Sequence, residues 1–128
     1  MRIKSESEKR LIVEGQVNGK SAYFLIDTGA SVGLIDKEKK KKYGLKEGFR
    51  YHGTLIGAGG EIKDVKHCDT FVELEGKTIP QFLLADISNV VKSIKRETAI
   101  EILGVISLPQ MKFAGIGIDA NDMEIIIE

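Results

Sequence analysis

The stretch Phe24–Ser31 reads FLIDTGAS and places an acidic side chain directly after three large apolar residues. Apolar runs of this kind are typical of a buried strand, so Asp27 stands where such a strand ends. A carboxylate that is buried without a partner costs several kcal/mol. Asp27 is therefore either part of a turn just outside the core or a group retained for its chemistry.

The composition predicts one domain over residues 1–128, since a chain of 128 residues is long enough for a single sizeable core. The 19 basic and 19 acidic side chains cancel, so no net charge favours a nucleic acid or an anionic membrane as partner. No apolar run approaches the roughly 20 residues that span a bilayer. The start, MRIKSESEKR, lacks the apolar core of a signal peptide, and one cysteine leaves no disulfide within the chain. We expect a cytoplasmic location, with export as the alternative if a signal segment precedes these residues.

Short apolar runs rich in β-branched residues predict a mainly β fold. Asn18-Gly19 between Leu11–Val17 and Lys20–Asp27 is typical of a hairpin, because both turn residues tolerate a positive φ. The lysine-rich segment 36–43 predicts a short solvated helix that ends at Gly44. Its lysines could instead form a nucleic-acid patch, but a solvated helix face is the simpler interpretation.

The rest of the chain predicts further strands and few helices. The expected strands are Phe49–Ile56, Glu61–Val65, His67–Leu74, Lys77–Ala85, Ala99–Leu103 and a final hairpin of Lys112–Ile118 with Met123–Ile127. Gly104 is expected to end its strand, and Val105–Met111 to form a helical turn. Ser88–Thr98 predicts either a helix or a mobile insert. The absence of β-α-β alternation excludes a doubly wound parallel sheet.

One short segment is echoed later in the chain. GKSAYFLID at 19–27 is similar to GKTIPQFLLAD at 76–86, and both end at an aspartate. The match is either chance or a sign of two halves related by an approximate two-fold axis.

Asp27 followed by Thr28-Gly29 suggests chemistry that needs a second carboxylate. Two carboxylates brought together share one proton, because both cannot ionise cheaply. One then acts as a base on water and the other as an acid on a substrate carbonyl. The second acid has to come from the same chain or from a symmetry mate.

Three motifs in order resemble those of the retropepsin-like aspartic proteases. Asp27-Thr28-Gly29-Ala30-Ser31 after an apolar strand is similar to the active-site signature, and Gly57-Ala58-Gly59-Gly60 falls near the flap tip of that family. Ile102-Leu103-Gly104 resembles its later apolar-apolar-glycine motif, which packs beside the active-site turn. The likeness covers about Leu11 to Ile127.

The resemblance implies a closed, mostly antiparallel all-β barrel with one or two short helices, working as a homodimer on peptide or protein substrates. Each chain would give one Asp27, Thr28 would hydrogen-bond across the two-fold axis, and Gly29 would permit the close approach. Contacts to an extended peptide would come from two sets of residues: Ala30, Ser31, Ile102, Leu103 and Gly104 of the body, and Ile56, Gly57, Ala58, Gly59 and Gly60 of the flap. Neither a cofactor nor a metal is implied.

Some residues depart from the family pattern. The echo of Asp27, Asp86, lacks a following Thr-Gly, so we interpret it as a loop acid and expect the dimer to be required. Many bacterial relatives carry an acid where this chain has Val105-Ile106-Ser107, and viral relatives carry acids at the places of Ser31 and Val32. Substrate preference therefore does not transfer.

Simpler interpretations stay open for each motif. Asp27-Thr28-Gly29 is also a common turn, the glycine tract a common loop, and Ile102–Gly104 a core strand with a turn. The same barrel could also bind a peptide or build an assembly without cutting. His52, His67 and Cys68 lack the paired spacing of a metal site, so no metal is expected.

Overall fold

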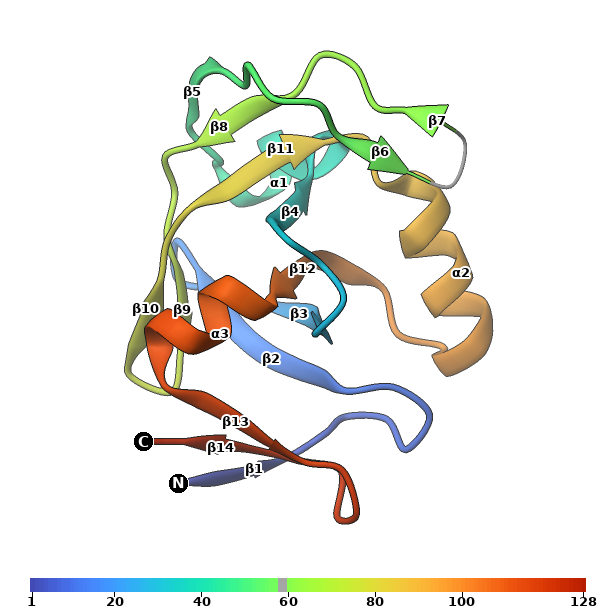
Figure 1. Ribbon diagram of the computed structural model, residues 1–128, viewed down its shortest axis with the longest axis vertical. Coiled ribbons are helices and arrows are strands. Elements are labelled where there is room, and N and C mark those ends of the chain that lie inside the picture. The colour runs from blue at the N-terminus through green and yellow to red at the C-terminus, as the bar shows by residue number, and fades with distance from the viewer. Residues whose placement is uncertain (58–59) are drawn as a thin grey trace.

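The computed structural model describes residues 1–57 and 60–128 (Figure 1). The strands are β1 (Arg2–Lys4), β2 (Ile12–Val17), β3 (Lys20–Asp27), β4 (Gly33–Asp36), β5 (Glu47–Arg50), β6 (Ile56–Gly57), β7 (Gly60–Glu61), β8 (Lys66–Cys68), β9 (Val72–Leu74), β10 (Lys77–Ile79), β11 (Phe82–Ala85), β12 (Ile102–Ser107), β13 (Ile116–Asp119) and β14 (Glu124–Ile127). The helices are the 3-10 turn η1 (Lys37–Lys39), α1 (Lys40–Tyr43), α2 (Ser88–Thr98) and α3 (Leu108–Ala114). In the described part of the chain no helix is long and apolar enough to cross a membrane.

A bent sheet of nine strands forms the body, in the order β10-β9-β2-β3-β12-β4-β11-β8-β5. Most neighbours are antiparallel, but β3 with β12 and β4 with β11 are parallel. The β5, β8 and β11 end lies at the top of Figure 1, and the smaller sheet β1-β14-β13 lies at the bottom. Buried side chains from β2, β3, β9, β10, β11 and β12 meet in one apolar cluster. The mostly β fold with a few short helices that was expected from the sequence is confirmed.

The first predicted hairpin is present. Asn18 and Gly19 have φ values of 51° and 78°, which only turn-forming residues adopt cheaply. In β3, Phe24 and Ile26 face the main apolar cluster, whereas Leu25 faces a second cluster on the other side of the sheet. Because both faces are covered there, the strand is apolar from Ala22 to Ile26, just before Asp27.

The helix predicted at 36–43 is also present, as η1 and α1. Asp36 accepts a hydrogen bond from the Glu38 N–H at its start, and Gly44, with φ 62°, ends it. Ser88–Thr98 forms α2, which agrees with the helical alternative for that segment.

Gly104 lies inside β12, so the prediction that it ends a strand is wrong. β12 runs from Ile102 to Ser107 and crosses β4 in antiparallel register. A Cβ at Gly104 would overlap the carbonyl oxygen of Leu34 and lie within 3.3 Å of Ile35. The glycine permits a close backbone contact and does not mark a turn. The helix predicted over Val105–Met111 accordingly starts only at Leu108, with Pro109 tolerated in its first turn.

Other predicted strands are shorter than expected. β5 stops at Arg50, and the run 67–74 divides into β8 and β9. The run 77–85 is broken by Pro80 and by Gln81, which has φ 68°. Ala99, with φ 66°, caps the end of α2, so β12 begins later than predicted.

Two halves of the sheet are related by an approximate two-fold axis. In one half Gly104 and Ser107 of β12 lie beside Phe24 and Asp27 of β3, and in the other half Gly33 and Asp36 of β4 lie beside Phe82 and Ala85 of β11. Each segment of the first half thus has a counterpart: FLID (24–27) matches FLLA (82–85), and GVIS (104–107) matches GLID (33–36).

Packing supports this correspondence. Phe24 and Phe82 are both fully buried, with ring centroids 6.1 Å apart. Ser107 and Asp36 both cap the helix that follows their strand. The structural counterpart of Asp27 is therefore Ala85 and not Asp86, to which the sequence echo points. Asp86 lies one residue further on and accepts a hydrogen bond from the Ser88 N–H, at 3.0 Å.

Replacing Gly104 by alanine tests the strand crossing. Because its Cβ would meet backbone, we expect Gly104→Ala to lower the free energy of unfolding by about 2–3 kcal/mol or more in urea titration. Gly117→Ala is the control, since the nearest atom to its Cβ would be 3.8 Å away. Equal stability of the two variants would contradict the close crossing.

Candidate active site

Asp27 is the last residue of β3 and is held in a tight turn. Its Oδ1 accepts a hydrogen bond from the Gly29 N–H at 2.9 Å, and its carbonyl oxygen accepts one from the Ala30 N–H at 3.1 Å. Oδ2 accepts no hydrogen bond from the described residues. Asp27 is half-buried, whereas Thr28, Gly29 and Ser31 are exposed. The turn thus presents one oriented carboxylate with a free oxygen at the surface.

The N-terminus of α3 supports this turn from behind. Ser107 of β12 is in register with Asp27, and the Leu108 N–H donates to the Ala30 carbonyl oxygen at 3.3 Å. Ser107 is buried and caps α3, with Gln110 completing a capping box. The helix start is thereby fixed to the residues that follow Asp27.

The buried amide of Gln110 joins three segments around the turn. Its Oε1 accepts from the N–H and hydroxyl of Ser107, at 2.9 and 3.0 Å, and its Nε2 donates to the carbonyl oxygen of Pro80 at 2.8 Å. The amide also packs against Gly33, where a Cβ would overlap it. Sequence reasoning missed Gln110, although Ser107-Leu108-Pro109-Gln110 carries the spacing of a capping box.

The predicted flap is a two-stranded hairpin. Ile56 pairs with Glu61 and Gly57 with Gly60, and the Ile62 N–H donates to the Leu55 carbonyl oxygen at 2.8 Å. The predicted tip residues Ala58 and Gly59 lie outside the described residues. Ile56 is 68% exposed. The hairpin lies beside the start of α2, as Figure 1 shows.

A cavity of about 510 Å³ separates the hairpin from the body of the protein. Its apolar walls are Leu34, Leu55, Ile62, Ile87 and Val90. Asp27 is not among the described residues that line it. The β6-β7 hairpin therefore faces α2 and Leu34 across this cavity, and the described part of the cavity does not include the Asp27 turn.

The apolar-apolar-glycine motif lies in the core. Ile102 and Leu103 are buried on opposite faces of the sheet, and Gly104 makes the crossing with β4. Within one protomer these residues position the Asp27 strand by packing and leave no side chain free for a peptide.

Asp36 is a second acid of interest, which sequence reasoning did not select as a site residue. It is only 2% exposed, and among the described residues its one hydrogen bond comes from the Glu38 N–H at 3.1 Å. Burial raises the pKa of Asp36 above its usual value. It caps η1 in the place where Ser107 caps α3.

Two features bear on the question of a metal. Cys68 is buried, and burial raises the pKa of its thiol. Elsewhere in the described ranges, Asp119, Asp122 and Glu124 form an acidic cluster. Arg2 pairs with Asp119 and Glu124 at 2.9 and 3.1 Å, which offsets the charge of that cluster.

Gln110→Leu tests the support of the turn. The change leaves the Ser107 N–H and the Pro80 carbonyl without their partner, and we expect a loss of about 2–3 kcal/mol in the free energy of unfolding. Gln16→Leu on the exposed face of β2 is the control and should change stability little. A similar small effect for both variants would show that the buried amide contributes nothing specific.

Asp36→Asn tests the buried acid through pH. The folded protein holds the Asp36 proton more tightly than the unfolded chain, so its contribution to stability falls as pH rises above the unfolded pKa of about 3.9. Asparagine does not titrate and keeps the acceptor for Glu38. The stability of Asp36→Asn relative to the natural protein should therefore increase between about pH 3.5 and pH 7 in urea titrations. A difference that is constant with pH would contradict the raised pKa.

Solved structures share this fold. The EIAV protease complexed with the inhibitor HBY-793 superimposes with a TM-score of 0.62 at 19% identity, covering 88% of this chain and 95% of that one. The retroviral protease-like domain of Ddi1 from Leishmania major gives 0.61 at 23% identity, with 93% and 88% covered. A retropepsin-like aspartic protease from Rickettsia conorii gives 0.58 at 19% identity, with 99% and 88% covered.

The sequence comparisons give the family. A search of curated protein sequences finds no match to this chain. The family model described as aspartyl protease matches residues 13–105, which includes the Asp27 turn, the flap hairpin and the strand crossing at Gly104. The chain therefore belongs to the aspartyl protease family and has the retropepsin-like fold.

Proposed function

We propose that the protein is an aspartic endopeptidase that works as a homodimer, with one Asp27 from each chain at its active site. The observation that carries the proposal is the asymmetry between the two halves of the sheet. Asp27 ends β3 in an Asp-Thr-Gly turn, whereas its counterpart in the same chain is the buried Ala85. One chain thus offers one carboxylate where the chemistry needs two.

The proposed reaction is hydrolysis of a peptide bond by water held between the two carboxylates. The pair shares one proton, so one Asp27 is ionised and its mate is protonated. The ionised carboxylate takes a proton from the water as the water oxygen bonds to the carbonyl carbon, and the mate protonates the carbonyl oxygen. The tetrahedral intermediate then breaks its C–N bond as the nitrogen takes the proton from the first Asp27, while the mate takes a proton back from a hydroxyl of the intermediate. No metal, cofactor or covalent intermediate takes part, and we expect activity to be best at mildly acidic pH.

The shape of the turn supports a two-fold contact between chains. An isologous interface brings the same surface of both copies together, so the turn would meet itself. Thr28 and Gly29 are exposed at its tip, and Gly29 has no side chain to keep the partner away. The Thr28 hydroxyl would hydrogen-bond across the axis and hold both Asp27 side chains in place.

The flap hairpin would close over an extended peptide. Its strands carry the exposed Ile56 and the small residues Gly57 and Gly60, which leave backbone groups available for strand-like pairing. Ala30 and Ser31, next to the Asp27 turn, would contact the peptide from below. Closure would exclude bulk water from the paired carboxylates.

Mixing two forms of the protein tests the shared site. Asp27→Asn alone should not cleave a peptide library at pH 4–7. When equal amounts of natural and Asp27→Asn protein pair at random, half of the natural chains enter mixed dimers with one acid, so activity should fall to about half. A larger excess of the variant should lower activity further.

Asp86→Asn is the matched control, because Asp86 is the acid that the sequence echo points to. It should cleave on its own and should not inhibit in mixtures. Three results would contradict the proposal. They are cleavage by the Asp27→Asn protein by itself, an Asp86→Asn protein that is inactive by itself, and a natural protein whose activity does not change when Asp27→Asn protein is added.

A further inference from the structure

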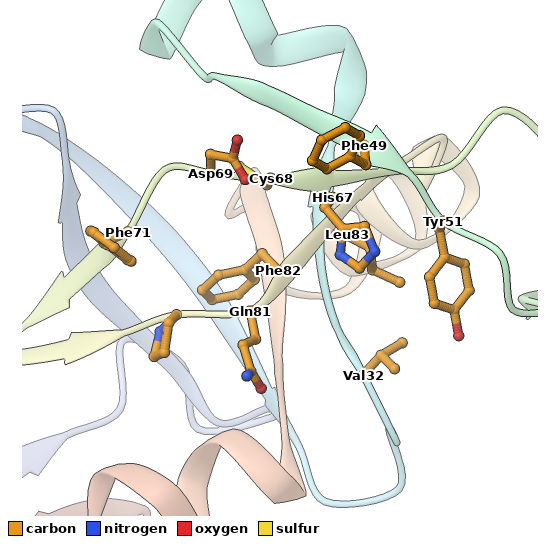
Figure 2. Close-up of a pocket in the computed structure, with 11 residues that line it drawn as sticks. Val32, Phe49, Tyr51, His67, Cys68, Asp69, Phe71, Gln81, Phe82 and Leu83 are labelled. Atoms are coloured by element: carbon orange, nitrogen blue, oxygen red, sulfur yellow. The ribbon is translucent and has the colours of Figure 1, made fainter.

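A second cavity, of about 680 Å³, lies between β5, β8 and β11 (Figure 2). We call it the aromatic groove, defined by Val32, Phe49, Tyr51, His67, Phe71 and Phe82. Figure 2 shows rings from three strands and from the loop before β9 facing this space. Its volume is within the range of sites for small organic ligands, so it holds one large side chain with room to spare.

Two phenylalanines of the groove are exposed to solvent. Phe49 is 88% exposed and Phe71 is 59% exposed, whereas Phe82 is fully buried. Tyr51 and His67 contact edge to face, with centroids 5.8 Å apart at 76°. Grouped exposed rings on a protein surface are typical of a binding site, and rings of this kind favour another ring as partner.

One wall of the groove is close to the Asp27 turn along the chain. Val32, in its wall, follows Asp27 by five residues, which places the two at most about 18 Å apart along the chain. An extended peptide rises about 3.3 Å per residue, so a peptide that crosses Asp27 reaches the groove within about five residues.

The backbone of the groove is strained at one point. Gln81 has φ 68°, a conformation that costs free energy in a residue with a side chain, and it lines the groove between Pro80 and Phe82. Strained residues of this kind gather at ligand sites.

We propose that the aromatic groove binds an aromatic side chain of the substrate, within about five residues of the bond that is cut. This deepens the proposed function and rests on it for the identity of the substrate. A two-fold dimer would carry two grooves, one on each side of the paired Asp27 residues. The enzyme would then favour extended peptides with phenylalanine, tyrosine or tryptophan at a fixed distance from the scissile bond.

Binding to the Asp27→Asn protein tests the proposal without relying on cleavage. A displayed library of random, extended peptides is selected on this variant, and the enriched residues are read by sequencing. We expect an aromatic residue at one fixed position. Replacing it by alanine in a selected peptide should weaken binding, measured by calorimetry, about tenfold or more.

Phe49→Ala in the same Asp27→Asn background should weaken binding of the selected peptide by a similar factor. With the peptide in which alanine replaces the aromatic residue, Phe49→Ala should weaken binding little further. The reason is that the two changes remove the same contact. Phe113→Ala is the control, since Phe113 is 75% exposed on α3, outside the groove, and should leave binding unchanged. Thermal unfolding of each variant checks that the fold is intact.

Three outcomes would overturn the proposal: enrichment of aliphatic or charged residues only, equal binding by Phe49→Ala and Phe113→Ala, or a selection that enriches nothing. The proposal would also be overturned if Phe49→Ala made a dimer dissociate and left the peptide preference unchanged. That result would mean that a second copy of the chain occupies the groove. Failure of the natural protein to cut a peptide that binds in the groove would contradict the proposed catalysis and leave the groove intact as a binding site.

Discussion

The backbone of β12 passes so close to that of β4 at Gly104 that no side chain fits between them. This contact holds the two central strands of the sheet together and allows β3 and β11 to pair in parallel on either side. Because β3 is parallel to β12, both strands end on the same side, where Ser107 starts α3 and Asp27 starts its turn. The position of the acid is thus set by a contact between backbones several residues away from it.

The two halves around this crossing are alike in packing and unlike in chemistry. Phe24 and Phe82 contact each other across the approximate axis, and each half ends in a polar cap, Ser107 or Asp36. Only one half leaves a half-buried carboxylate at its surface, because Ala85 occupies the matching place in the other. A protomer built in this way offers half of a two-acid site, which is why a second copy is central to the proposed function.

Sequence reasoning predicted the features that depend on local chemistry. The Asn18-Gly19 hairpin, the helix ended by Gly44 and the mainly β fold follow from turn residues and apolar patterns. It failed where a residue serves a distant contact: Gly104 was predicted to end a strand, whereas glycine can also permit a close backbone approach inside one. The repeated segment in the sequence pointed to Asp86 as the counterpart of Asp27, one residue beyond the true counterpart Ala85. Strand register is set by the partner strand and not by similarity of sequence. For Gln110 the local capping-box spacing with Ser107 was overlooked, and its contacts with Pro80 and Gly33 form only through the fold.

The central claim is that two copies of Asp27 form one site, and the separation of these side chains in the dimer that exists in solution measures it most directly. A crystal structure of that dimer, with its interface checked against the solution species, gives the distance. The account predicts that the two carboxylates lie within hydrogen-bond reach, at about 3 Å between their nearest oxygens. Carboxylates tens of ångströms apart in a dimer that cleaves peptides, or cleavage by a strict monomer, would contradict it.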